Sequence, residues 1–215
     1  MPDPNLFRLR VEYVKLGRLS LLSHLEIARA LERAVRRADL PFAVSQGFSP
    51  HMKIAFGSAL PVGVGSTCEI FDLQMTRYVA PERALAALQD ASVPDLMPHA
   101  CRYIESRDAA ASVAYPFATY RAELSEEPED GLAFPETVQV VRKKKQKTLV
   151  VSEFLAEEPM VRGKVVTFEL EAKPTGSLRP DVLLRACLDE WKAAHPAAEP
   201  LRVVSVTRTA QRATR

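Results

Sequence analysis

Alternating apolar and charged residues near the start of the chain predict a first strand. Over residues 7–14, apolar side chains occupy every second position, and arginine or glutamate stands between them. This period of two is typical of a strand with one face toward a core and the other toward solvent. The sequence therefore predicts a half-buried strand whose polar face carries Arg8, Arg10 and Glu12.

Residues 23–40 carry the clearest helical pattern in the chain. Ser23 and Glu26 have the spacing of a capping box, in which both side chains satisfy backbone N–H groups at the helix start. Apolar residues recur at helical spacing on one face, at Ile27, Leu31, Ala34, Val35 and Ala38. The opposite face carries Arg29, Arg33, Arg36 and Arg37. The helix is expected to end near Pro41, because the residue before a proline avoids helical backbone.

The remaining elements of the first half predict a ferredoxin-like unit. A loop at residues 47–51 precedes a short strand at 52–56, and a longer strand follows at 68–75. A proline opens a short amphipathic helix at 82–89, and a further strand is expected at 99–105. The order β-α-β-β-α-β is that of an antiparallel sheet with both helices on one face.

The second half is expected to form a related but irregular unit. Residues 108–114 are small and polar and are interpreted as a linker. Strand-like segments and one helix, at 180–194, follow; the strands are expected at 117–124, 137–141, 148–154, 164–172 and 201–207. We therefore expect an α+β protein of two tandem ferredoxin-like units with antiparallel sheets, residues 1–107 and 115–215. In the second unit, the first helix would be reduced or replaced by strands.

Composition and charge exclude several classes of protein. The 29 Lys and Arg against 27 Asp and Glu leave a net charge of +2, too small for a protein that coats nucleic acid by bulk charge. Apolar runs fall far short of the roughly 20 residues that span a bilayer, and the N-terminus lacks a signal-peptide pattern. We therefore expect a cytoplasmic protein with no membrane partner.

The cysteines and the familiar motifs give no sign of a resident cofactor. Cys68, Cys101 and Cys187 are far apart, which argues against a disulfide framework, a zinc site of paired thiolates or an iron–sulfur centre. The chain also lacks a P-loop, a G-x-G-x-x-G string, a G-x-S-x-G string and an H-E-x-x-H string. We expect buried thiols, with no metal or cofactor on this chain.

Positive charge is concentrated in two places. Residues 142–147 hold five cations and no acid, and the flanking strands predict an exposed hairpin tip, because like charges repel. The arginine face of the first helix could bind phosphates or an acidic protein. The alternative is an ordinary solvent-exposed helix surface with no binding role. The acidic segment 126–136 balances these patches, and such segregation suits docking. The candidate nucleic-acid-binding residues are Arg29, Arg33, Arg36, Arg37, Arg142, Lys143, Lys144, Lys145 and Lys147.

Two histidines and one loop are the candidates for specific chemistry. If the fold brings His24, His51 and Glu26 together, they could bind a metal or act as acid and base. Alternatively, the capping box occupies Glu26 and the histidines are structural. The glycines at 57–65 could hold a phosphate, but a hairpin or bulge is the simpler interpretation. The candidate ligand loop comprises Ser45, Gln46, Gly47, Phe48, Ser49, Pro50, His51, Lys53, Gly63 and Gly65.

Four strings resemble a known bacterial family. They are LSHLE at 22–26, RAVRRADLP at 33–41, SQGFSPHMK at 45–53 and ALPVGVGS at 59–66. Together they resemble the radical-SAM-associated domain of unknown function, which occurs as a separate chain or fused behind a radical S-adenosylmethionine (SAM) module. The resemblance is strongest over residues 7–75. The basic segment 142–147 and the string GSLRP at 176–180 resemble later features of that family. The resemblance to this family implies partnership with a radical SAM protein and a role around RNA. It assigns no activity and no catalytic residue.

These observations lead to one main hypothesis and two alternatives. The main hypothesis is a non-catalytic adaptor that presents RNA, or a substrate bound to RNA, to a radical SAM protein. Any iron–sulfur cluster and S-adenosylmethionine would then belong to that partner. The alternatives are an RNA-processing or RNA-modifying enzyme that uses His24 and His51, and a protein-docking module with an acidic partner.

Overall fold

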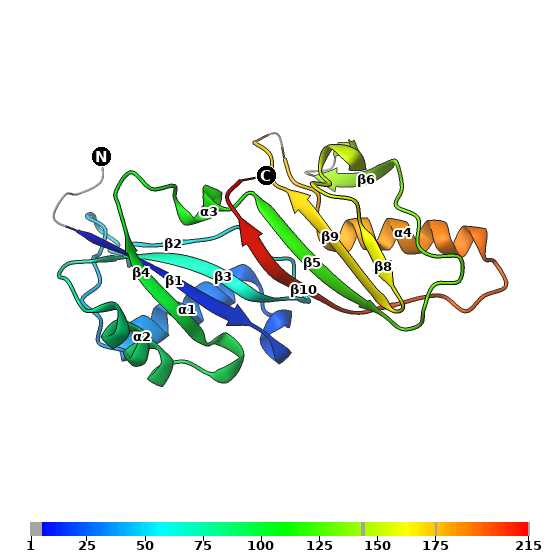
Figure 1. Ribbon diagram of the computed structural model, residues 1–215. Coiled ribbons are helices and arrows are strands. Elements are labelled where there is room, and N and C mark those ends of the chain that lie inside the picture. Colours follow the sequence, from blue (N-terminus) through cyan, green and yellow to red (C-terminus); the bar gives the residue numbers. More distant parts are fainter. Residues whose placement is uncertain (1–5, 143–144, 175, 215) are drawn as a thin grey trace. The chain divides into compact units, whose positions relative to one another are not determined.

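The computed structural model shows an α+β protein and describes residues 6–142, 145–174 and 176–214 (Figure 1). The chain divides into two compact units, Met1–Tyr115 and Pro116–Arg215, called unit 1 and unit 2 below. The strands within each unit pair antiparallel.

Unit 1 has the predicted β-α-β-β-α-β order. Strand β1 lies between β3 and β4 and is antiparallel to both, while β2 pairs antiparallel with β3. Two short 3₁₀ helices and a short α-helix complete the unit. Its elements are β1 (Phe7–Lys15), η1 (Gly17–Leu21), α1 (His24–Arg37), β2 (Ile54–Phe56), β3 (Val64–Met75), α2 (Pro81–Asp90), η2 (Pro94–Leu96), β4 (Pro98–Ile104) and α3 (Ala111–Ala114).

Helices α1 and α2 cover one face of this sheet and form the core of unit 1. Leu9 and Phe71 from the strands pack with Leu31 from α1 and Leu88 from α2. The predicted capping box is confirmed, since Ser23 accepts a hydrogen bond from the Glu26 N–H and the Glu26 carboxylate accepts from the Ser23 N–H. Helix α1 ends at Arg37, slightly before the predicted end, and the backbone then turns through a positive φ of 50° at Asp39.

The opposite face of the sheet is covered as well, which corrects two predictions. Arg10, expected on a solvent-facing side of β1, is only 4% exposed. Ala111 and Ala114 of α3 pack against Ile70 of β3. Residues 108–114 are therefore part of unit 1 rather than a free linker, because the chain after β4 folds back over the sheet.

Unit 2 follows the same plan with one replacement. Its strands lie in the order β10-β5-β9-β8, and a separate pair, β6 and β7, occupies the place in the chain where unit 1 has its first helix. This is compatible with the predicted irregular ferredoxin-like unit. Its elements are β5 (Phe117–Leu124), β6 (Thr137–Arg142), β7 (Lys145–Val150), η3 (Val151–Glu153), β8 (Met160–Arg162), β9 (Val165–Glu171), α4 (Pro180–Ala194) and β10 (Val203–Arg212).

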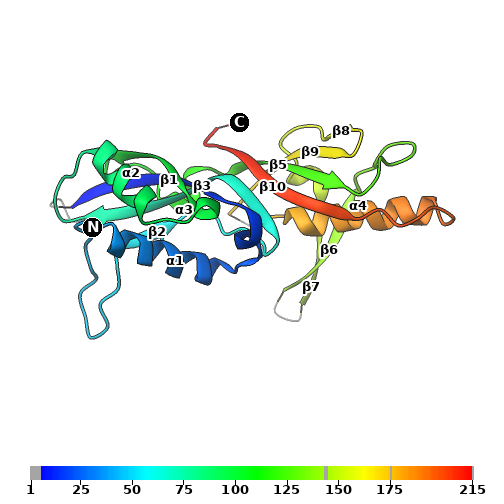
Figure 2. The same ribbon diagram turned by 90° about the horizontal axis from the view of Figure 1, so that it is seen from below.

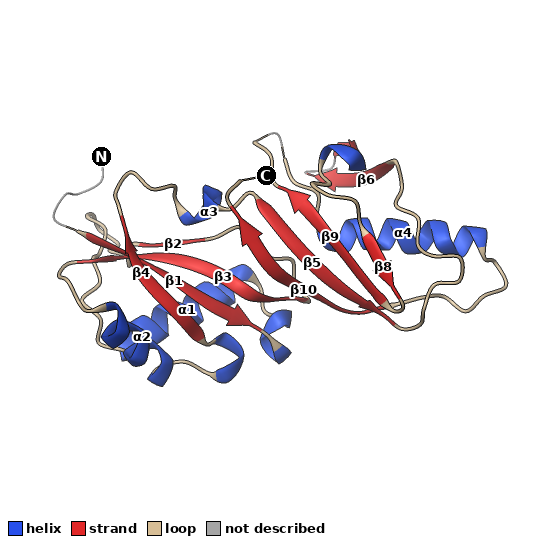
Figure 3. Ribbon diagram, viewed as in Figure 1, coloured by secondary structure: helices blue, strands red, loops and turns tan. Residues whose placement is uncertain are grey.

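Helix α4 is the one long helix among the described residues of unit 2 and matches its predicted bounds (Figure 3). Its apolar side, with Leu183, Leu184, Cys187 and Trp191, is buried. Two strand predictions need correction. The strand predicted at 148–154 stops at Val150 and gives way to η3, and the three-residue strand β8 was not predicted. No described helix combines the length and the apolarity needed to cross a membrane.

Candidate nucleic-acid interface

The described residues of the basic segment 142–147 lie on two paired strands, as the sequence predicts. Strands β6 and β7 pair antiparallel from Thr137↔Val150 to Arg142↔Lys145, so two residues of sequence connect the last pair. The ribbon extends away from the rest of unit 2 (Figure 2). Lys147 is exposed. The side chains of Arg142 and Lys145, and all of Lys143 and Lys144, lie outside the described part of the chain.

The base of the hairpin is anchored while its outer face is polar. Val138 and Leu149 are directly opposite each other in the ladder, and both are buried, at 3% and 7% exposure. On the other face, the side chains of Gln139 and Thr148 exchange hydrogen bonds of 2.8 and 3.1 Å. Apolar packing therefore anchors the base of the hairpin, and strand pairing continues from there as far as Arg142 and Lys145.

The arginine face of α1 is exposed, as predicted. Arg29 and Arg33 are one turn apart, and neither makes an ion pair within the described residues. The guanidinium carbon of Arg36 lies 5.1 Å from the centroid of the Phe42 ring. Arg37 donates a 2.9 Å hydrogen bond to the carbonyl of Ala91. This face thus presents cations whose charges remain available to an anionic partner.

The structure gives His24 and His51 different neighbours. The His24 ring meets Phe56 edge-on, with centroids 5.5 Å apart. His51 Nε2 lies 3.5 Å from the Ser49 hydroxyl. The capping box occupies Glu26, which was the third candidate of this group. Over the described ranges, no interaction joins the two histidines, and no group of three His, Cys, Asp or Glu is placed to hold a metal.

The candidate ligand loop forms a projecting turn, visible between α1 and β2 in Figure 2. The Ser45 N–H donates to the His51 carbonyl at 2.8 Å, and the His51 N–H donates to the Ser45 hydroxyl at 3.0 Å. These two bonds close the loop, and Phe48 within it is fully exposed. Gln46, Gly47, Ser49 and Pro50 are also exposed.

The glycines at 57–65 are engaged in the fold. The Gly57 N–H donates to the Ile70 carbonyl and the Gly63 N–H donates to the Ser20 carbonyl, both at 2.9 Å. Gly63 has a φ of 89°, which suits a turn, and Gly65 is buried inside β3. These contacts favour the hairpin interpretation of the segment over a phosphate cradle.

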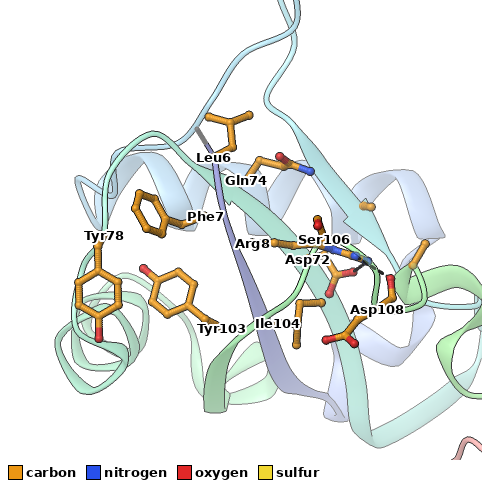
Figure 4. Close-up of a pocket in the computed structure, with 12 residues that line it drawn as sticks. Leu6, Phe7, Arg8, Asp72, Gln74, Tyr78, Tyr103, Ile104, Ser106 and Asp108 are labelled. Carbon is orange, nitrogen blue, oxygen red and sulfur yellow. Dashed lines mark hydrogen bonds and ion pairs between the residues drawn. The ribbon is translucent and has the colours of Figure 1, made fainter. Parts of the chain in front are cut away.

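A pocket of about 690 Å³ lies where β1 begins and where β3 and β4 end (Figure 4). We call it the end pocket. It combines aromatic rings with charged and amide groups, and its lining includes Phe7, Arg8, Asp72, Gln74, Tyr78 and Tyr103.

Arg8 and Asp72 form the polar floor of the end pocket. Arg8 Nη2 lies 2.6 Å from Asp72 Oδ2 and 3.0 Å from the carbonyl of Ala109, and Nη1 lies 2.9 Å from the carbonyl of Asp108. The Asp72 side chain is 3% exposed and that of Arg8 is 14% exposed. The floor is therefore built into the sheet and tied to the segment that covers it.

Sequence reasoning missed the end pocket. The available signal was the presence of arginines and an aspartate within strands that otherwise bury apolar residues, since charges in such positions are paired when buried. The pattern alone does not say which distant residue provides the partner.

One known protein family matches most of the chain. A family described as "Uncharacterized protein conserved in bacteria (DUF2344)" matches residues 8–180. The chain belongs to this family. In this DUF2344 protein, the match includes α1, the candidate ligand loop, the basic hairpin and the end pocket apart from Leu6 and Phe7. No curated protein matches the chain. The family description supplies no activity.

Proposed function

We propose that this DUF2344 protein is a non-catalytic RNA-binding partner of a radical SAM protein. The observation that carries the RNA-binding part is the basic hairpin. Five cations fall within six residues at the end of a paired ribbon whose base is anchored by Val138 and Leu149. Like charges at such close spacing repel one another, and a polyanion relieves that repulsion.

RNA is favoured over an acidic protein because a phosphodiester backbone offers a regular row of charges. The sequence of the hairpin contains several cations, α1 carries several exposed arginines, and arginine pairs with phosphate through two parallel hydrogen bonds. The net charge of +2 indicates that binding depends on these local patches rather than on the whole molecule. The radical SAM part of the proposal is supported by the resemblance of residues 7–75.

The test is the salt dependence of RNA binding. Binding of cellular RNA is measured against salt for the parent and for a variant with Lys143, Lys144, Lys145 and Lys147 changed to alanine. Each phosphate contact contributes about 0.7 to the slope of log affinity against log salt for single strands, so the slope should fall by roughly 3 in the variant.

A matched control removes the same charge elsewhere in unit 2. Arg121, Arg162, Arg179 and Arg185 are exposed, and Arg121 and Arg179 are paired with neighbouring acids. Alanine at these four positions should leave the salt slope unchanged. Equal slopes for the parent and both variants would reject the hairpin as an RNA-binding element and direct the search to an acidic protein.

The partnership is tested separately. The tagged chain should co-purify with a protein that carries a cysteine-ligated iron–sulfur cluster and uses S-adenosylmethionine. If that protein is recovered equally with an untagged control, the partnership is rejected.

A further inference from the structure

Local constraints hold the ring of Phe48 in solvent at the tip of the loop 45–51. The two hydrogen bonds between Ser45 and His51, of 2.8 and 3.0 Å, close this loop at its base. Beside Phe48, the backbone of Gly47 has a φ of 128°, which residues other than glycine rarely adopt, and Pro50 restricts the backbone on the other side. The loop therefore has a defined shape, and both faces of the Phe48 ring are open because this residue is fully exposed.

The side chains beside Phe48 suit a nucleobase better than the pocket of a partner protein. Gln46 and Ser49 lie on either side of it in the sequence, and both are exposed and carry neutral hydrogen-bonding groups. A residue that anchors a protein interface is usually surrounded by further contacts that exclude water, whereas these neighbours are polar. An open aromatic ring with neutral hydrogen-bonding groups beside it is what proteins use to stack on and read an unpaired base.

The charges near the loop are compatible with a polyanion. The sequence contains no Asp or Glu from residue 40 to residue 68, and Lys53 follows the loop closely. On the other side, the chain reaches the loop from α1 through Phe42, and the guanidinium carbon of Arg36 lies 5.1 Å from the centroid of that ring. Asp39, which is exposed, is the acidic residue between α1 and Phe42. The segments that enter and leave the loop therefore each carry a cation.

We propose that Phe48 stacks on an unpaired base of RNA. This inference rests on the proposed RNA-binding function and deepens it, because it makes single-stranded RNA the ligand. Inside a duplex the bases already stack on one another and leave no face for an inserted ring. The loop 45–51 then contacts the base, while the basic hairpin and the arginines of α1 contact phosphates.

The first measurement compares single-stranded with double-stranded RNA. The probe is a fluorescein-labelled RNA of about 12 nucleotides and mixed sequence, used alone or annealed to its complement, and fluorescence anisotropy gives the affinities. Phe48→Ala should weaken binding of the single strand about 5- to 150-fold, the range for the loss of one base–aromatic stack, and should leave duplex binding unchanged. Unchanged binding of the single strand would overturn the proposal and leave a protein as the partner of this ring. Equal weakening for both RNAs would also overturn it.

Two further variants test the ring itself. Phe48→Trp keeps an aromatic face and should bind the single strand like the parent. Its indole also reports the contact, because Trp191 is the only natural tryptophan and is buried, so stacking should quench the added fluorescence. Tyr78→Ala removes another exposed ring, outside the loop, and should bind the single strand like the parent. A loss in Tyr78→Ala equal to that in Phe48→Ala would overturn the assignment to the loop.

Salt dependence separates this inference from the hairpin proposal. Stacking releases no counterions, so Phe48→Ala should lower the affinity for the single strand while keeping the salt slope of the parent. If the four-lysine hairpin variant keeps the parent's slope but Phe48→Ala weakens binding of the single strand, the hairpin proposal fails and the loop proposal stands. A change in the hairpin variant alone rejects the loop proposal alone. A parent that binds neither RNA rejects both.

Discussion

The carboxylate of Asp72 holds the guanidinium of Arg10 through two hydrogen bonds, from Nε at 2.7 Å and from Nη2 at 3.0 Å. Both side chains are nearly excluded from solvent, with 3% and 5% exposure. The hydrogen bond that Arg10 donates to Asp72 raises the pKa of Arg10 despite the opposing effect of burial. Asp72 also accepts from the Ala111 N–H at 3.0 Å. One carboxylate thus joins β1, β3 and the segment that covers the sheet.

Removal of this carboxylate should strongly destabilise the protein. Asp72→Ala leaves the Arg10 guanidinium buried without its counter-ion, and breaking a buried pair in this way costs about 3–5 kcal/mol. Urea unfolding of the parent and the variant measures the difference. The control is Glu105→Ala, which breaks the exposed pair with Arg107 and should cost no more than about 1 kcal/mol. Equal losses of unfolding free energy in Asp72→Ala and Glu105→Ala would show that the buried pair of Asp72 and Arg10 does not stabilise the fold more than an exposed pair does.

Local patterns were sufficient to predict most of unit 1. The start and the buried face of α1 follow from the capping box at Ser23 and from apolar residues at helical spacing, because both depend on residues a few positions apart. The basic hairpin was predicted for a similar reason, since a charge cluster between two strand-like segments is a local feature.

Long-range pairing was not predictable from one sequence. Arg10 and Asp72 are 62 positions apart, and the alternation in β1 is identical whether its charged face meets solvent or a buried carboxylate. The end pocket was missed for the same reason, because Phe7, Tyr78 and Tyr103 become neighbours only after β1 and β4 pair. The small side chains of residues 108–114 also gave no sign that they pack on the sheet.

Two leucines of α1 provide a matched test of which face is buried. Leu31 is 1% exposed and Leu25 is 68% exposed. Leu31→Ala should lower the free energy of unfolding by about 2–5 kcal/mol, because it removes buried methyl groups and leaves a cavity. Leu25→Ala should change it by no more than about 0.5 kcal/mol. Denaturant titration of both variants measures these changes. A larger loss of unfolding free energy for Leu25→Ala than for Leu31→Ala would show that the wrong face of α1 is assigned as buried.

The capping box should make stability depend on acid pH. The hydrogen bond from the Ser23 hydroxyl, and then that from the Ser23 N–H, lowers the pKa of Glu26 below its ordinary value of 4.5. A lowered pKa in the folded state stabilises the protein above the unfolded-state pKa, and this stabilisation is lost as pH falls through the folded-state pKa. The difference in free energy of unfolding between the parent and Glu26→Ala should therefore become smaller below pH 4.5. A difference that is constant from pH 7 to pH 3 would contradict the ionised capping box.

Cys187 should resist alkylation while the protein is folded. The thiol is fully buried in α4, and burial raises its pKa to about 12, so the reactive thiolate is almost absent at pH 8. Iodoacetamide at pH 8 should modify Cys187 only when denaturant unfolds the chain, which peptide mass spectrometry detects. Because Cys187 packs beside Leu183, Leu184 and Trp191, its labelling rate measures the opening of the α4 core. Labelling of Cys187 that is faster than global unfolding would mean that α4 detaches on its own. The expected protection of Cys187 by burial would then be wrong.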